Sequence, residues 1–343
     1  MAVTILSQRQ PFRGLRRLNP YRDLRQVTAL IAETFGADLD AEGQAALREM
    51  QALGWLGPLV AFVLAADPQL QRMLQGYVWI EEGRVVGNLS LQSGLRYGER
   101  WHISNVAVAP AYRGRGIARA LVEAALEEVE REGGGWATLQ VEAENEAACR
   151  LYARLGFEAL GGMACLHLAE PPATPPPTTL IPSLRPWRAD DWHGEYELAR
   201  AVTPGLLQWW QPLRSEAFRR YPEDWLGEAF NRLIGRQRTY RWVVEGGAGV
   251  RAGLRPAPTL AASLWLRAVG WRGEHHLRLM VHPEARGALE EPLLRQALAV
   301  LSACPPRPTV AQHPAEDQQA IAAFLAHGFR VRRTLVAMRK RIR

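Results

Sequence analysis

The sequence predicts an α+β fold of α/β/α layers, in which a central mixed, mostly antiparallel sheet is flanked by helices, and it predicts this arrangement twice. Three observations lead to that expectation: segments of alternating polar and apolar residues, amphipathic helical stretches between them, and a proline-rich stretch that separates two similar halves. The 343 residues are enough for about two domains of ordinary size.

The elements of the first half follow from the spacing of its apolar residues. Alternation and β-branched residues predict strands, whereas apolar residues three and four positions apart predict helices. The expected strands cover residues 14–18, 77–81, 85–91, 101–108, 138–141 and 157–168. The expected helices cover residues 21–35, 42–53, 116–132 and 146–155.

Residues 170–182 are so rich in proline that neither a helix nor a central strand is expected there. We expect an extended linker between a first domain at 1–169 and a second at 183–343. The halves match in register: Gly156-Phe157 recurs as Gly328-Phe329, Pro110–Gly114 as Pro283–Gly287, and the offset is 172 or 173 residues. The openings at 15–23 and 184–191 also correspond, which indicates an internal duplication.

Composition excludes several classes of protein. The formal net charge of +7 comes almost entirely from arginine, because Lys340 is the only lysine, and it is compatible with nucleic acid or with a phosphorylated cofactor. Three scattered cysteines predict neither a disulfide framework nor a zinc site, which favours a reducing, cytoplasmic compartment. The longest apolar run, 53–65, is too short to span a bilayer, and segment 55–67 is expected to form either an apolar lid or a further buried helix.

The most informative motif lies between an expected strand and an expected helix. In Arg113-Gly114-Arg115-Gly116 the glycines allow an anion to approach the backbone, and the arginines add charge. The helix that follows begins with amides that have no intrahelical acceptor. The motif therefore predicts a cradle for a diphosphate, although a glycine turn needed only for its geometry would look the same.

This motif resembles motif A of the GNAT superfamily of acyl-CoA N-acyltransferases. The segment from Asn145 to Gly156-Phe157, with Tyr152 seven residues after the asparagine, resembles motif B of that superfamily. The resemblance covers most of residues 12–169 and implies that acetyl-CoA is the cosubstrate, with no metal. It implies that the cofactor contacts Val106, Ala107, Val108, Arg113, Gly114, Arg115, Gly116, Ile117, Ala118, Asn145 and Tyr152.

The resemblance also implies catalytic roles. Tyr152 would give a proton to the departing thiolate, since the reference pKa of a tyrosine, about 10, suits that task. For the general base the candidates are His102 and Glu142, and water or another group remains an alternative. Some members of the superfamily carry a glutamate two positions before Glu142, where this chain has Gln140.

The second copy has lost the features that bind the cofactor. Leu289 stands where the first copy has Gly116, and Glu291 brings negative charge to the place of Ala118. Pro292 removes an amide, and Phe324 replaces the candidate proton donor. We expect a degenerate domain with a structural role or a role at the acceptor site.

The leading hypothesis is an N-acetyltransferase that transfers the acetyl group of acetyl-CoA to a primary amine of a small-molecule or peptide acceptor. The alternative is a CoA-binding regulatory module without turnover. A nucleic-acid-binding protein is disfavoured because arginines alternate with acids along both halves. We expect no nucleic acid or membrane partner, and either a monomer with two pseudo-dimeric domains or a homodimer.

Overall fold

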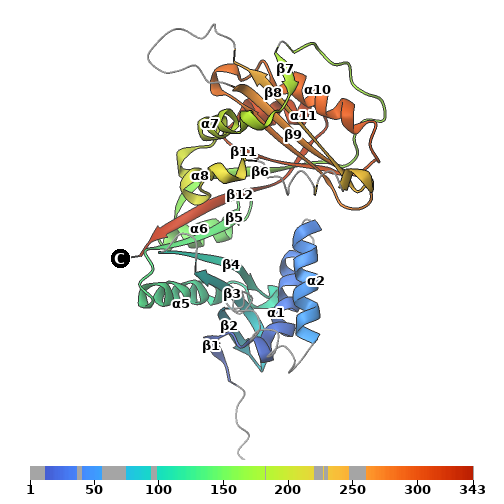
Figure 1. Ribbon diagram of the computed structural model, residues 1–343. Coiled ribbons are helices and arrows are strands. Elements are labelled where there is room, and N and C mark those ends of the chain that lie inside the picture. Colours follow the sequence, from blue (N-terminus) through green and yellow to red (C-terminus); the bar gives the residue numbers. More distant parts are fainter. Residues whose placement is uncertain are drawn as a thin grey trace, which may run out of the picture. The chain divides into compact units, whose positions relative to one another are not determined.

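The computed structural model describes residues 12–36, 41–55, 75–93, 99–181, 183–219, 227, 231–246 and 260–342 (Figure 1). The chain divides into two compact units. Unit 1 comprises Met1–Gln140, Ala147–Glu158 and Met338–Arg343, and unit 2 comprises Val141–Glu146 and Ala159–Ala337. The segment expected to form a lid or a buried helix lies, after Trp55, outside the described residues.

Unit 1 contains a sheet in the order β1-β2-β3-β4-β5, in which β4 and β5 are parallel and the other neighbours are antiparallel. Its strands, apart from a few end residues, are β1 (Gly14–Arg17), β2 (Gly76–Glu81), β3 (Arg84–Ser93), β4 (Arg100–Val108) and β5 (Trp136–Glu142). Its helices are α1 (Pro20–Phe35), α2 (Ala41–Trp55), α5 (Ile117–Arg131), α6 (Glu146–Arg154) and the short 3-10 turn η2 (Pro110–Tyr112).

Helices cover both faces of this sheet, as the sequence predicts. Apolar residues of α1 pack with Val78, Val85 and Ala107 on one face. On the other face Gly87 of β3 leaves room for α5, because a Cβ at this position would lie 2.8 Å from a side-chain carbon of Ile117. The close approach of α5 to β3 thus depends on a glycine.

Unit 2 repeats the same order of elements. Its strands are β6 (Glu158–Leu168), β7 (Leu184–Pro186), β8 (Gln237–Glu245), β9 (Leu260–Val269), β10 (His275–Val281), β11 (Thr309–Pro314) and most of β12 (Arg330–Arg341). Its helices are α7 (Trp192–Val202), α8 (Gly205–Trp210), α10 (Glu290–Leu301) and α11 (Gln318–Ala326), with 3-10 turns η3 (Ala189–Asp191), η4 (Ser215–Ala217) and η5 (Pro283–Ala285). Residues of α10 and α11 form the main core with β9 and β10, whereas α7 packs on the opposite face. The predicted layered α+β architecture is confirmed in both units.

The strand that ends the first repeat in sequence belongs to unit 2. There β6 lies between β12 and β11 and pairs antiparallel with β11, from Thr309↔Leu168 to Pro314↔Met163. The compact units therefore do not coincide with the stretches on either side of the proline-rich segment. Local periodicity predicts that β6 is a strand but carries no information about its partner.

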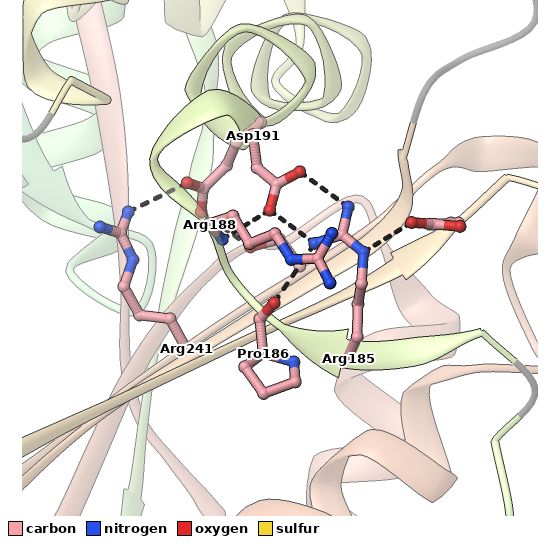
Figure 2. Close-up of polar contacts among 8 residues, drawn as sticks. Arg185, Pro186, Arg188, Asp191 and Arg241 are labelled. Carbon is pink, nitrogen blue, oxygen red and sulfur yellow. Dashed lines mark hydrogen bonds and ion pairs between the residues drawn. The ribbon is translucent and has the colours of Figure 1, made fainter.

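One ion pair recurs at the opening of both repeats. Arg16 and Asp23 form two parallel hydrogen bonds of 2.6 and 2.7 Å, and Arg185 and Asp191 form two of 2.7 and 2.8 Å (Figure 2). In each unit the carboxylate also accepts a backbone amide 2.7 Å away. This shared bond ties the first strand to the start of the first helix and supports the predicted duplication.

Asp191→Asn should destabilise unit 2 by about 1.5–3 kcal/mol at neutral pH, because it removes a charged acceptor from Arg185. The hydrogen bond from Arg185 holds the pKa of Asp191 below its usual value. The stabilisation of the folded state by the Arg185–Asp191 pair is therefore present above the unfolded-state pKa of about 3.9. It is lost as the pH falls through the lower folded-state pKa of Asp191. Urea unfolding of both proteins at pH 7 and in acid measures the difference.

The matched control is Glu245→Gln, since Glu245 is the more exposed second carboxylate on Arg185. It should cost less than Asp191→Asn. A difference between Asp191→Asn and the wild type that grows in acid would contradict this assignment.

Candidate active site

The loop between β4 and α5 presents a row of unbonded backbone amides. Gly114 and Gly116 have φ of +75° and +79°, and a Cβ at either position would meet no atom within 4 Å. Within the described residues no backbone carbonyl accepts from the amides of Arg115, Gly116, Ile117 or Ala118, and Gly116 caps α5 without a side-chain bond. These amides are concentrated at the positive end of the helix dipole, where an anion is stabilised.

The side chains of the two arginines of this loop donate hydrogen bonds to nearby backbone carbonyls. The Arg113 Nε donates to the carbonyl of Val108 at 3.2 Å, and the Arg113 amide donates to Pro110. The Arg115 guanidinium donates to the carbonyl of Ala111 at 3.1 Å and stacks on the Tyr112 ring. Both residues are exposed, so they can turn toward an anion in exchange for weak contacts.

Beside this loop, β4 and β5 separate. Their parallel pairing runs from Arg100↔Trp136 to Ile103↔Leu139 and goes no further. The stretch of β4 that contains Val106, Ala107 and Val108 pairs with β3 on its other side. This geometry gives β4 an open backbone edge at the residues that the resemblance implies to be in contact with the cofactor.

The open edge begins at a β-bulge. Asn105 has φ of +51°, and β4 has one residue more than β3 between Asn88 and Ser90. The Asn88 side chain, which has no exposed surface, donates to the carbonyl of Asn105 at 3.0 Å, and the Asn105 side chain donates to Ser90 Oγ at 3.2 Å. The Asn88 Oδ1 is buried without a described partner. A left-handed residue and an unpaired buried oxygen are costly, and such strain is typical of functional sites.

Tyr152 lies on α6 and is 6% exposed. Its ring contacts Phe157 edge-on, with the ring centroids 5.9 Å apart. Burial, and to a lesser degree the nearby Cys149, raises the pKa of Tyr152 to about 12. The phenol is therefore protonated at neutral pH and available as a hydrogen-bond donor.

His102 lies on β4 opposite Thr138 of β5. The Thr138 hydroxyl donates its proton to the carbonyl of Trp101 at 2.8 Å. The hydroxyl oxygen can therefore only accept a hydrogen bond from the His102 Nδ1, which lies 3.5 Å away. The backbone of Thr138 also hydrogen-bonds the His102 ring, and burial lowers the pKa of His102. Burial therefore favours the neutral imidazole, and the hydrogen bond to the Thr138 backbone opposes this effect. The contact with the Thr138 hydroxyl favours a proton on Nδ1, which leaves Nε2 as the basic nitrogen.

Glu142 and Asn145 fall at the end of β5 and just before α6, in the segment assigned to unit 2. The Glu142 carboxylate forms a 3.5 Å ion pair with Arg333, and its carbonyl accepts from the Asn145 amide at 3.0 Å. The other predicted site residues belong to unit 1: His102, Val106, Ala107, Val108, the loop at 113–118 and Tyr152.

The corresponding loop of unit 2 already holds a negative charge. Gly287 has φ of +81°, like Gly114, but its amide donates to Glu290 Oε2 at 2.7 Å. Glu290 is 2% exposed at the start of α10. The sequence analysis missed this residue and considered Leu289, Glu291 and Pro292 instead. The missed signal was an acid three residues after the loop glycine, at a helix start.

A second interaction near this loop of unit 2 engages its arginine. Arg286, the counterpart of Arg113, lies with its Nε 3.1 Å from Asp317 Oδ2, and His313 Nε2 is also 3.1 Å from that oxygen. Burial alone would raise the pKa of Asp317, but the hydrogen bonds from His313 and the Ala320 amide outweigh it and lower the pKa. The arginine that could meet a phosphate is thus engaged by an internal carboxylate.

Residues 46–157 match the model of the acetyltransferase (GNAT) family. The matched segment contains the loop at 113–118, the open edge of β4 and Tyr152.

N-alpha-acetyltransferase 30 of Schizosaccharomyces pombe is 34% identical over 83 residues, which cover 24% of this chain and 55% of that protein. Ribosomal protein bS18-alanine N-acetyltransferase of Escherichia coli strain K12 is 45% identical over 53 residues, which cover 16% of this chain and 36% of that protein. The chain thus spans about half, or less, of the length of these curated relatives.

Two solved structures share the fold along almost the whole chain. A GCN5-related N-acetyltransferase from Sphaerobacter thermophilus superposes with a TM-score of 0.58 at 18% identity, covering 96% of this chain and 95% of its own. A tandem GNAT protein from the clavulanic acid biosynthesis pathway superposes with a TM-score of 0.52 at 18% identity, covering 96% and 99%. Among the described residues no helix is long and apolar enough to cross a membrane, and no group of three or more His, Cys, Asp or Glu residues could hold a metal ion.

The bulge gives a direct test of local strain. Asn105→Val should be less stable than Asn105→Gly by about 1–2 kcal/mol, because both variants lose the Ser90 contact but only glycine adopts a positive φ without cost. Chemical unfolding measures the order. At Ser104, which has no positive φ, valine should be at least as stable as glycine. If the glycine variant were more stable than the valine variant at both positions, or at neither, the assignment of backbone strain to Asn105 would be contradicted.

Proposed function

We propose that this protein is an N-acetyltransferase that transfers the acetyl group of acetyl-CoA to a primary amine, and that only the first repeat carries out the reaction. The observation that carries the proposal is the loop from Gly114 to Ala118 beside the open edge of β4, within the segment that matches the GNAT family. Acetyl-CoA is the cosubstrate of that family.

Each part of the loop and strand has a task in binding. The amides of Gly114 to Ala118 hold the diphosphate, and Arg113 and Arg115 add charge-assisted bonds of about 1.5–3 kcal/mol each. The open edge of Val106 to Val108 hydrogen-bonds the amide-containing arm as an added strand would. Asn145 contacts the same arm. These residues fix the thioester beside the bulge at Asn105.

The reaction forms a bond from the amine nitrogen to the acetyl carbon and breaks the bond from that carbon to sulfur. At neutral pH the acceptor is mostly an ammonium ion, which must first lose a proton to free its lone pair, and the neutral imidazole of His102 accepts that proton at Nε2, directly or through water. Glu142 is the second candidate base, although its carboxylate is engaged by Arg333. Tyr152 donates a hydrogen bond to the departing sulfur. Its raised pKa favours this stabilisation over complete proton transfer, since a thiol has a reference pKa of about 8.5.

The names of the relatives indicate which amines to test first. Two of them are named for acetylation of an α-amino group or of an alanine of a ribosomal protein. We therefore place the α-amino group of a peptide ahead of small amines, aminoglycosides and free amino acids. The alternative, a regulatory module that binds CoA without turnover, predicts binding but no thiol release with any amine.

Tyr152→Phe tests the chemistry. The variant should lower kcat by about 10²-fold or more with little change in affinity for acetyl-CoA, because the ring remains and only the donor is lost. A thiol-release screen across amine classes, peptides first, measures turnover. Tyr196→Phe, at a tyrosine of unit 2, should leave the rate unchanged. A Tyr152→Phe enzyme with full turnover would refute the assigned donor.

Calorimetry tests how many sites the chain has. One acetyl-CoA should bind per chain, and Gly116→Leu should abolish the heat, because leucine cannot adopt φ of +79° without strain and obstructs the approach of the diphosphate. Glu290→Gln should leave the stoichiometry at one. Two sites per chain, or binding that survives Gly116→Leu, would contradict the proposal.

A further inference from the structure

Unit 2 carries a row of arginines and one tryptophan on the sheet face that α7 packs against. Arg241 of β8 and Arg278 of β10 are both direct partners of Trp265 on β9, so the three side chains lie side by side on one face. Arg267 follows Trp265 by two residues and shares that face. We call these four residues the Arg–Trp face.

The Arg–Trp face has more positive charge than the described residues around it balance. The nearest carboxylate, Glu195 of α7, is 2% exposed and is already bound by Arg241 Nη2 at 3.0 Å and by Ser263 Oγ at 2.7 Å. Throughout the described part of the chain, no carboxylate lies within ion-pair distance of Arg267 or Arg278. Among the described residues, Arg241 is thus the member of the face that has an ion pair, and the guanidinium groups of Arg267 and Arg278 have none.

Aromatic rings hold these guanidinium groups in place. Arg278 lies over the Phe218 ring at 5.3 Å, Arg267 over Trp265 at 5.7 Å and Arg241 over the ring of Trp187 at 4.1 Å. Desolvation lowers the pKa of Arg278, yet part of this side chain is exposed to solvent. The guanidinium is still charged at neutral pH, so the face carries a fixed positive charge that a ligand can reach.

The same region of unit 1 has a different chemistry. The parallel pairing of β10 and β11 ends at Leu277↔Ala311, as that of β4 and β5 ends at Ile103↔Leu139, so Arg278 follows the strand separation as Ser104 does. In unit 1 the direct partner of Ser104 is Ser90, whereas in unit 2 the partner of Arg278 is Trp265. Both units thus have separated strands, but unit 2 has an arginine and an indole where unit 1 has two hydroxyl groups.

We propose that the Arg–Trp face binds a small organic anion, a carboxylate or phosphate attached to a planar group. The anionic group pairs with Arg278 and the neighbouring arginine of the row, and the planar group lies against Trp265. This site is independent of acetyl transfer in unit 1.

Calorimetric titration of the full chain with benzoate and with phenyl phosphate tests the proposal, with benzyl alcohol as a neutral probe. At least one anion should bind saturably with a stoichiometry of one, more weakly as salt is added, and benzyl alcohol should give no saturable heat. The stronger of the two anions identifies the anionic group. Saturable heat from benzyl alcohol equal to that of the anions, or no saturable anion binding, would overturn it.

Variants locate the site. Arg278→Gln should weaken anion binding at least tenfold, and Arg267→Gln several-fold, whereas Arg272→Gln, at an exposed arginine after β9, should not. The thermal midpoint of Arg278→Gln should be unchanged or higher, because the change removes an unbalanced charge. Arg113→Gln should leave anion binding intact. If Arg113→Gln abolishes it and Arg278→Gln does not, the anion binds at the loop of unit 1 and the proposal fails.

Discussion

The candidate site depends on the point at which two parallel strands stop pairing. After Ile103 and Leu139 the backbone of β4 has no described neighbour on the β5 side, and the bulge at Asn105 follows at once. Backbone polar groups that a sheet would normally satisfy are thereby left for a ligand. The same edge leads into the loop at Gly114, so the open strand and the anion cradle are consecutive parts of one segment.

Sequence reasoning reached the parts of this site that depend on local spacing. The strand, the glycine loop and the helix after it were predicted because their signals lie within a few residues of each other. It did not reach Asn88 and Ser90, whose hydrogen bonds hold Asn105, because the pairing of β3 with β4 depends on register across a turn. The partner of β6 was out of reach for the same reason, since pairing with β11 joins residues far apart in sequence.

The two repeats show which features the fold itself requires. Both keep the bidentate arginine–aspartate pair at the opening and the early end of the parallel pairing. Among the described residues, the bulge between the third and fourth strands of the repeat occurs in unit 1, where β3 pairs with β4, and not in unit 2, where β9 pairs with β10 without a register shift. The shared ion pair stabilises the opening of each repeat, whereas the bulge at Asn105 is costly unless a ligand uses it.

The loop of unit 2 shows how such a cost can be removed. A helix start with unbonded amides attracts negative charge, and Glu290 supplies it from inside the chain at Gly287. The positive charge of the neighbouring Arg286 is balanced by an ion pair with Asp317. A carboxylate from within the chain thus satisfies, in unit 2, a loop amide that would otherwise attract an anion from outside.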